Sequence, residues 1–78
     1  MWYVYAIQSL KDGHLYTGIS QNPEDRLKQH NYGMTKSTKG RRPFKIIYKE
    51  TCRDRVDARK REKYLKSGIG REFLEQFL

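Results

Sequence analysis

The first twenty residues carry the pattern of a β-hairpin, and no other part of the chain limits the fold as strongly. Residues 2–8 and 15–20 are rich in aromatic and β-branched side chains, which favour strands. Asp12 and Gly13, between these two runs, supply the turn chemistry typical of a hairpin. The chain is therefore expected to begin with two antiparallel strands.

Side chains alternate between the two faces of a strand, so the hairpin fixes the placement of its tyrosines. Tyr3, Tyr5 and Ile7 share one face of the first strand, and Tyr16 and Gly18 share one face of the second. Gly18 has no side chain, which leaves space for another backbone or a substrate to approach beside Tyr16. The pattern therefore marks Gly18 as a position of close approach.

A helix is expected to follow the hairpin, starting at Pro23 and ending at about the residue before Gly33. Asn22 is a good capping residue, Pro23 suits the first helical position, and the two acids after it suit the positive end of the helix dipole. Arg26 and His30 lie one helical turn apart. Their side chains can therefore point the same way.

The second half of the chain predicts a third strand, over residues 44–48, and two further helices. The long helix should run from near Asp54 to Ser67, with Gly68 in the left-handed conformation after its end. Glu62 lies on the face of this helix that should turn toward the sheet. The predicted apolar stripe of the long helix is Ala58, Leu65 and Ile69, and that of the terminal helix is Phe73, Leu74, Phe77 and Leu78.

A length of 78 residues is enough for one small domain and too short for two, so residues 1–78 are expected to form a single domain. The single cysteine, Cys52, excludes an internal disulfide, and no Cys/His spacing suits structural zinc. This cysteine usage favours a reduced, cytoplasmic protein. No apolar stretch approaches the roughly 18 to 20 residues that span a bilayer, and no leader peptide is expected at the start.

The net charge of +8 is concentrated in one half of the chain. Residues 36–66 hold 13 of the 17 Lys and Arg residues but only four of the nine acids. This excess favours a polyanionic partner such as nucleic acid, although a solubilising surface gives the same composition. An anionic membrane fits poorly, because no strongly apolar helical face opposes the cations. The cations expected to contact phosphates, or only solvent, are Lys36, Lys39, Arg41 and Arg42 in a polar loop and Arg59 and Lys63 in the long helix.

Five residues have side chains that phosphodiester chemistry can use. The phenols of Tyr5 and Tyr16 can hold a water molecule, Arg26 can bind phosphate oxygens, and Glu62 can bind a divalent cation. A free phenol, with a pKa near 10, is only about 0.1% ionised at pH 7, so a tyrosine base needs nearby cations or a metal-bound water. His30, with an ordinary pKa of about 6.5, is better matched to neutral pH.

Each of these residues also has a purely structural interpretation. Strand tyrosines commonly pack their rings in a core and place their hydroxyls at its edge. A helical glutamate commonly pairs with a cation four residues away, where Lys66 stands. An arginine can pair with an acid, and a histidine can cap or pack. The functional interpretation therefore depends on the ordered set rather than on any single member.

In order and spacing, this set resembles the GIY-YIG endonuclease superfamily, and closely its small single-domain bacterial branch. Residues 3–5 (YVY) resemble a degenerate first motif, and residues 16–18 (YTG), after an interval of ten residues, resemble the second. Arg26, His30 and Glu62 stand where the family has its helical arginine, a His or Tyr one turn later, and its metal-binding glutamate. The resemblance covers essentially the whole chain, including Arg59–Glu62 and Gly70–Leu74.

The resemblance implies an α+β fold, in which helices flank a three-stranded, mainly antiparallel sheet and the catalytic residues gather on one sheet face. It implies that Glu62 holds one Mg²⁺ or Mn²⁺, mostly through water. Tyr16 would orient or deprotonate the attacking water with help from Tyr5, and Arg26 would stabilise the phosphate. His30 would be an alternative proton acceptor or a hydrogen-bond partner of Tyr16.

The sequence therefore predicts a metal-dependent DNA endonuclease that hydrolyses phosphodiester bonds by water attack, in DNA repair or processing. Relatives in the superfamily include the incision subunit of bacterial nucleotide excision repair. The chain departs from the family pattern at Ile19, where some catalytic members carry a lysine, and no asparagine follows Glu62. One alternative is a DNA- or RNA-binding protein that keeps the fold without useful catalysis. Another is an accessory interaction domain whose partner protein supplies targeting.

Overall fold

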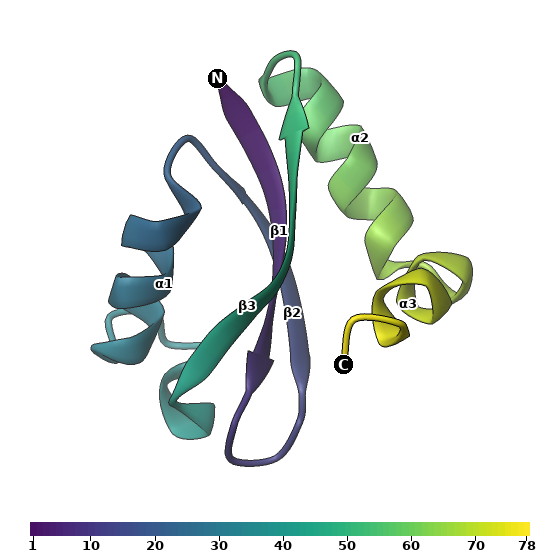
Figure 1. Ribbon diagram of the computed structural model, residues 1–78. Coiled ribbons are helices and arrows are strands. Elements are labelled where there is room, and N and C mark those ends of the chain that lie inside the picture. The colour runs from purple at the N-terminus through teal and green to yellow at the C-terminus, as the bar shows by residue number, and fades with distance from the viewer.

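A three-stranded antiparallel sheet lies between one helix on one face and two helices on the other (Figure 1). The computed structural model describes all 78 residues. The strand order is β2-β1-β3, so the first strand is central and the other two are edges. This architecture confirms the predicted α+β class. In chain order the elements are β1 (Trp2–Ser9), β2 (Leu15–Ser20), α1 (Pro23–Asn31), the short 3₁₀ helix η1 (Lys39–Arg41), β3 (Phe44–Cys52), α2 (Arg55–Lys66) and α3 (Gly68–Glu75).

The third strand is longer than predicted, because it pairs with β1 along the whole length of that strand. The pairing runs from Trp2 opposite Cys52 to Ser9 opposite Phe44. The alternation of side chains is interrupted once, between Ala6 and Ile7, where the register shifts. Backbone pairing satisfies the hydrogen-bonding groups of both strands, and this tertiary requirement extends β3 beyond the apolar run that marks it in the sequence.

The first two helices start as their capping residues predict. The Asn22 side chain accepts a hydrogen bond from the Asp25 amide at 3.2 Å, and Asp54 accepts one from the Asp57 amide at 2.9 Å. Gly33 has a φ of +78°, which suits the left-handed conformation after α1. The predicted start and end of the first helix are thus confirmed to within a residue.

The predicted role of Gly68 is wrong, because α3 begins at this residue without a left-handed turn. Ser67 ends α2 and also caps α3, accepting a hydrogen bond from the Gly70 amide at 3.3 Å. Ile69 is consequently 68% exposed and does not belong to the stripe of α2. Gly70 is buried, and a Cβ atom there would overlap the Tyr64 carbonyl oxygen, so glycine permits the close packing of α3 on α2.

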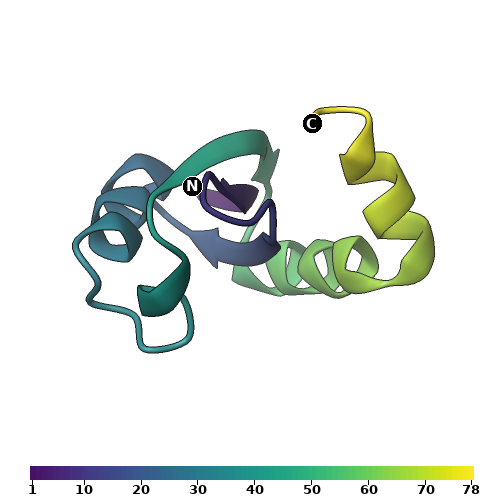
Figure 2. The ribbon, with the colours of Figure 1, turned by 90° about the horizontal axis from the view of Figure 1, so that it is seen from below.

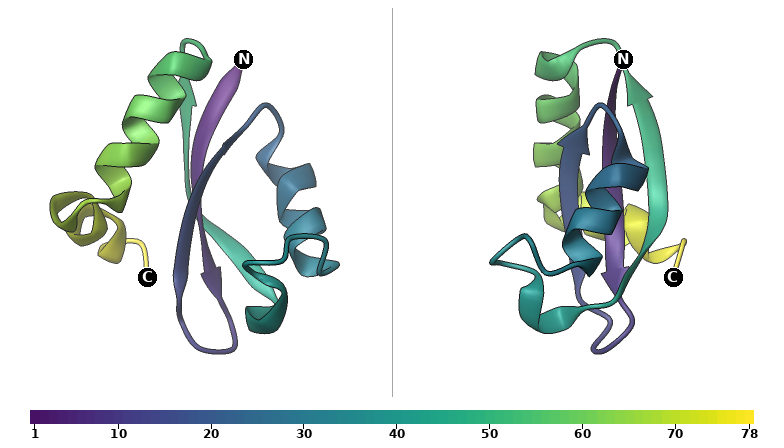
Figure 3. Two further views of the ribbon diagram at one scale, coloured as in Figure 1. Left: turned by 180° about the vertical axis from the view of Figure 1, so that it is seen from behind. Right: turned by 90° about the vertical axis from the view of Figure 1, so that its left-hand side faces the viewer.

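The core is divided between the two faces of the sheet. Figures 2 and 3 show that helices cover both of these faces. On the face covered by α2 and α3, the buried residues are Val4, Ala6, Cys52, Ala58, Leu65 and Leu74. On the α1 face they are Tyr5, Ile7 and Phe44, packed against Tyr16, Leu27 and Ile46. Of the predicted terminal stripe, Leu74 is buried and Phe73 packs against the core, whereas Phe77 and Leu78 are exposed. None of the helices is long and apolar enough to cross a membrane.

Candidate nuclease site

A cleft of about 340 Å³ opens at the β2 edge of the sheet. Helices α1 and α2 cover opposite faces of the sheet (Figure 3). Both helices contribute side chains to the cleft. The cleft therefore spans the edge of the sheet, which differs from the expectation that the site lies on one sheet face. Five residues predicted for the site line it together, namely Tyr5, Tyr16, Arg26, His30 and Glu62.

Gly18 makes room for the phenol of Tyr5, its partner across the β1–β2 pair. A Cβ atom at position 18 would lie 2.8 Å from the Tyr5 Oη and 2.9 Å from its Cζ. Close approach is thus a property of Gly18, and the group that approaches is a side chain rather than another backbone. Gly18 also lines the cleft, so the approach of a substrate beside Tyr16 stays a prediction. The ring of Tyr5 is 3% exposed and packs against Ile7 and Phe44, so it has little freedom to move away.

His30 connects the Tyr5 phenol to a buried threonine. The Tyr5 hydroxyl lies 3.3 Å from His30 Nε2, and Thr38 Oγ1 lies 2.8 Å from His30 Nδ1. His30 was expected to be an alternative proton acceptor or a partner of Tyr16, whereas its tyrosine partner is Tyr5. The difference arises because β1 is central and projects Tyr5 over Gly18 toward α1.

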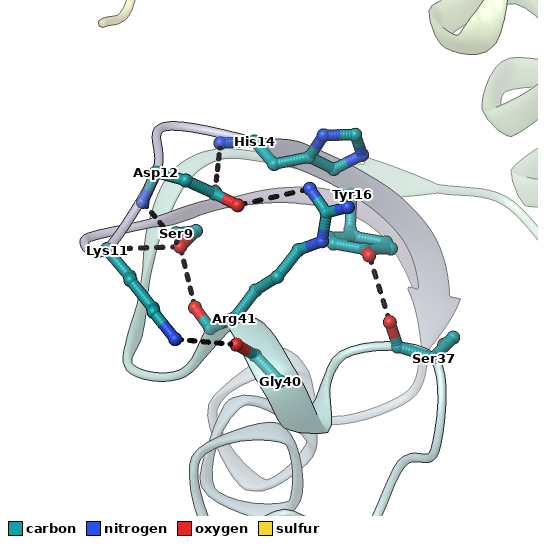
Figure 4. Close-up of polar contacts among 8 residues, drawn as sticks. All are labelled: Ser9, Lys11, Asp12, His14, Tyr16, Ser37, Gly40 and Arg41. Carbon is teal, nitrogen blue, oxygen red and sulfur yellow. Dashed lines mark hydrogen bonds and ion pairs between the residues drawn. The ribbon is translucent and has the colours of Figure 1, made fainter.

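Tyr16 has a different environment, nearer to solvent. Its hydroxyl donates a hydrogen bond to the Ser37 carbonyl oxygen at 2.9 Å (Figure 4). Its ring packs edge-on against Phe44, with 5.6 Å between the ring centroids. The phenol oxygen keeps lone pairs that can accept a hydrogen bond from a water molecule in the cleft.

The site keeps His30 neutral and Tyr5 protonated near pH 7. Burial lowers the pKa of His30 below its ordinary value of 6.5, and the nearby positive charge of Arg26 lowers it further. Burial raises the pKa of Tyr5 above 10.0, although the charge and hydrogen bond of Arg26 oppose this rise and Glu62 adds to it. The contact between Tyr5 and His30 is therefore one between a protonated phenol and a neutral imidazole.

Arg26 has donors available for an anion. Its Nη1 donates to the Gln29 side-chain oxygen at 2.6 Å, and it forms no ion pair with a carboxylate. The structural alternative, in which Arg26 serves only to pair with an acid, is therefore excluded. A guanidinium that lines a cleft without a carboxylate partner is suited to phosphate oxygens.

Glu62 projects from α2 into the same cleft and is only 8% exposed. Its carboxylate lies 3.3 Å from Lys66 Nζ and 3.8 Å from Arg59 Nη1. Both cationic side chains are largely exposed, so their pairing with Glu62 is screened by water and is easily exchanged. Glu62 is therefore on the buried face of α2, as its helical position predicts, and the pairing with Lys66 that a structural role would give also occurs.

The residues around Glu62 suit a single hard cation that keeps most of its water. No group of three or more His, Cys, Asp or Glu side chains is arranged to hold a metal ion. A cage of protein ligands is thus absent, and Glu62 is the one carboxylate in the cleft. Mg²⁺ commonly binds in this way, through one or two carboxylates and several waters, so the donor set fits Mg²⁺ or Mn²⁺ at Glu62.

Five polar residues that line the cleft were not predicted as site residues, namely Thr17, Thr35, Ser37, Thr38 and Lys66. Thr38 lies in the loop between α1 and η1 and is only 1% exposed. Lys66 lies on the last turn of α2 and lines the cleft beside Glu62. The spacing of Glu62 and Lys66 signals their contact, but nothing in the sequence indicates that Thr38 is buried.

The six cations predicted to contact phosphates lie outside the cleft. In the loop, Arg41 pairs with Asp12 at 3.1 Å (Figure 4), and the Arg42 guanidinium covers Gly33. Lys36 and Lys39 are exposed and form no ion pair. On α2, Arg59 and Lys63 border a shallow groove together with Arg55, Val56 and Lys60. None of the six lines the cleft, although the loop and α2 both contribute other residues to it.

The fold and the cleft are those of a small α+β domain of the nuclease type, built around two tyrosines on adjacent strands. Residues 1–72 match the sequence pattern of the GIY-YIG catalytic domain. The chain belongs to the GIY-YIG family, which is a nuclease family.

Several similar proteins are small members of this family. A UPF0213 protein of Desulfotalea psychrophila is 46% identical over 67 residues, which are 83% of this chain and 60% of that protein. A UPF0213 protein of Clostridium perfringens is 45% identical over 67 residues, or 85% of this chain and 71% of the relative. This chain therefore spans about three fifths of the first relative. The solution NMR structure of a UPF0213 protein from Bacillus halodurans has a TM-score of 0.56 and 32% identity, covering 97% of this chain and 84% of the other.

Proposed function

We propose that this chain is a metal-dependent DNA endonuclease that hydrolyses phosphodiester bonds by water attack. The observation that carries the proposal is that Tyr5, Tyr16, Arg26, His30 and Glu62 line one cleft. These residues come from β1, β2, α1 and α2, so their meeting is not a local consequence of sequence spacing. A metal-dependent enzyme of DNA repair or processing fits this set of side chains.

Two tyrosines act on the attacking water in this proposal. Tyr16, nearer to solvent, accepts a hydrogen bond from the water and orients it. The water gives a proton to the Tyr5 oxygen as the Tyr5 proton moves to His30 Nε2, which lies 3.3 Å from that oxygen. The new P–O bond forms as the bond to the leaving oxygen breaks, and the leaving oxygen takes a proton from solvent. Neutral His30 is the net proton acceptor.

Charge on the phosphate is balanced by Arg26 and by the ion that Glu62 would hold. Arg26 donates hydrogen bonds to the non-bridging oxygens as negative charge accumulates. Glu62 would hold Mg²⁺ or Mn²⁺, which when bound would supply Lewis-acid stabilisation of the phosphate. Lys36, Lys39, Arg41, Arg42, Arg59 and Lys63 are proposed to contact the flanking phosphates of DNA.

A substitution of Glu62 tests the catalytic proposal. Nicked, branched and supercoiled DNA are incubated with Mg²⁺ or Mn²⁺ and with the wild type or Glu62→Gln. Cleavage should fall by about 100-fold or more, because the cation loses its protein ligand. Glu72→Gln, an exposed glutamate on α3 without an ion pair, is the matched control and should retain activity. Equal cleavage by Glu62→Gln and the wild type would contradict the proposal.

A nucleic-acid-binding protein without catalysis is the second candidate, and the basic half of the chain favours it. Residues 36–66 hold 13 of the 17 Lys and Arg residues. If DNA or RNA binds with a strong dependence on salt while neither metal supports cleavage, this second candidate replaces the first.

A further inference from the structure

Three buried side chains in the wall of the cleft, two with hydroxyl groups and one imidazole, form a chain of polar contacts. Starting from Tyr5, it passes through His30 to Thr38 Oγ1, at distances of 3.3 Å and 2.8 Å. Thr38 Oγ1 continues the chain by donating a hydrogen bond to the Thr35 carbonyl oxygen at 3.3 Å. Tyr5, His30 and Thr38 are all buried, so water does not readily replace any of these partners.

Each buried proton along this chain needs an acceptor, and this requirement distinguishes the two tautomers of His30. A neutral imidazole donates from one nitrogen and accepts at the other. His30 Nε2 is the one protein group within hydrogen-bond distance of the Tyr5 hydroxyl that can accept its proton, because the Arg26 guanidinium beside the phenol can only donate. If Nε2 carried the His30 proton, the buried Tyr5 proton would lose this acceptor, which costs roughly 1–3 kcal/mol for an unsatisfied group. The arrangement in which every buried proton has an acceptor is thus the one with Nε2 unprotonated and Nδ1 donating to Thr38 Oγ1.

The hydroxyl of Thr38 can accept this proton because its own proton has another acceptor, the Thr35 carbonyl oxygen. The Thr38 amide donates to the same carbonyl oxygen at 3.1 Å. Residues 35–38 thus form a turn that presents the oxygen of Thr38 to His30 as an acceptor. A valine at this position would have similar volume but no oxygen.

The hairpin holds this loop from its other side, as Figure 4 shows. Ser9 Oγ donates to the Arg41 carbonyl oxygen at 2.6 Å, and Lys11 Nζ donates to the Gly40 carbonyl oxygen at 3.3 Å. The Tyr16 hydroxyl donates to the Ser37 carbonyl oxygen at 2.9 Å. The loop therefore contacts both tyrosines of the cleft, Tyr16 directly and Tyr5 through Thr38 and His30.

We propose that Thr38 is a positioning residue that holds His30 in the tautomer with the proton on Nδ1, leaving Nε2 free to take the proton of Tyr5. The consequence for cleavage depends on the proposed function, because only there does Nε2 serve as the proton acceptor. The tautomer itself does not depend on it. The neutral state that this tautomer needs is favoured by burial and by Arg26, which lower the pKa of His30.

Nitrogen NMR of ¹⁵N-labelled protein measures the tautomer without reference to activity. In the wild type, at about pH 7.5 and thus above the ordinary histidine pKa, His30 Nδ1 should have the shift of a protonated nitrogen and Nε2 that of an unprotonated one. Thr38→Val should move the proton toward Nε2, and Thr38→Ser should restore the wild-type pattern. Thr51→Val, an exposed threonine of β3, is the control and should leave His30 unchanged.

Two results would overturn the proposal. One is a wild-type spectrum with the His30 proton on Nε2, which can be read even if the Thr38→Val variant does not fold. The other is a folded Thr38→Val variant with an unchanged tautomer. In cleavage assays, Thr38→Val should lower kcat about 10- to 100-fold with little change in KM. This loss is smaller than the roughly 100- to 10,000-fold contribution of proton-transfer catalysis, because His30 itself is still present. Thr38→Ser should recover the activity. A wild type with the predicted tautomer but no cleavage would contradict the proposed function and leave the tautomer assignment standing.

Discussion

Replacing Gly18 with alanine should destabilise the protein by forcing the Tyr5 ring out of its place. The new Cβ atom would lie 2.8, 2.9 and 3.2 Å from the Oη, Cζ and Cε1 atoms of Tyr5. Ordinary van der Waals contacts begin at 3.4 Å, so the ring has to move by about 0.6 Å at its hydroxyl end. Ile7 and Phe44 pack against this ring, which is 3% exposed, so the movement disturbs the core on the α1 face.

The expected loss of stability has two parts. Overpacking a well-packed site costs roughly 1–3 kcal/mol. Moving the phenol also weakens its hydrogen bond to His30, which contributes about 1 kcal/mol. A domain of this length has a net stability of only about 3–5 kcal/mol, so Gly18→Ala should remove about half of it or more. The thermal midpoint should fall by roughly 4–8 °C for each kcal/mol lost.

Urea unfolding followed by the fluorescence of the single tryptophan, Trp2, measures this loss. Gly40→Ala is the matched control, because no atom lies within 4 Å of a Cβ atom there and its φ is not positive. In a Tyr5→Phe background the hydrogen bond is absent, and so is the Oη atom that lies closest to the new Cβ atom, so Gly18→Ala should cost at least about 1 kcal/mol less. A Gly18→Ala variant as stable as Gly40→Ala would refute the packing argument, and an equal cost in both backgrounds would refute the hydrogen-bond part.

Two further predictions concern the charged groups of the cleft. Folding lowers the pKa of His30, so protonation of this histidine favours the unfolded state. Its contribution to the free energy of unfolding should be fully present above about pH 6.5 and should decline below that pH, by at most about 1.4 kcal/mol per pH unit. Urea unfolding from pH 7.5 to pH 5 should show a weaker decline for His30→Gln than for a control at the exposed His14, His14→Gln; equal slopes would contradict the cause assigned here. Lys66→Met should tighten Mn²⁺ binding about two- to fivefold at low salt, because the lysine competes with the ion for the Glu62 carboxylate. Lys66 Nζ lies 3.3 Å from Glu62 Oε2, and such an exposed ion pair contributes about 0.2–1 kcal/mol. Lys63 lies on the same helix and forms no ion pair, so calorimetric titration of Lys63→Met should show no such gain in affinity. Equal Mn²⁺ affinities of the two variants would contradict binding of the ion by Glu62.

The ends of the helices could be predicted from the sequence where one local contact decides them. Asn22 and Asp54 cap their helices through amides three residues later, and Gly33 adopts the positive φ that only a few residues tolerate. The predicted left-handed conformation of Gly68 is wrong, because Ser67 both ends α2 and caps α3, so the chain needs no left-handed residue between these helices. The same local signal, a glycine after a helix, thus has two structural outcomes.

The site could be predicted as a set of residues but not as a geometry. Tyr5 and Gly18 share a register position across two strands, and that pairing is visible once the hairpin is predicted. That the space over Gly18 is filled by Tyr5 depends on the ring orientation of Tyr5, which packing with Phe44 on β3 helps to determine. Thr38 reaches His30 only because the loop is tied to the hairpin, a contact between segments far apart in the chain.

The position of the cleft at the sheet edge also bears on the absence of a lysine at position 19. Ile19 packs against the core on the α2 face while it lines the cleft, so its side chain contributes to the contact between β2 and α2. Arg26 places a guanidinium in the same cleft from α1, and its charge and hydrogen bond oppose the rise in the pKa of Tyr5. A positive charge near a phenol favours its ionised form, and this effect depends on distance rather than on which strand or helix carries the charge. A lysine directly after the second motif is therefore not the only way for this fold to place a cation beside Tyr5.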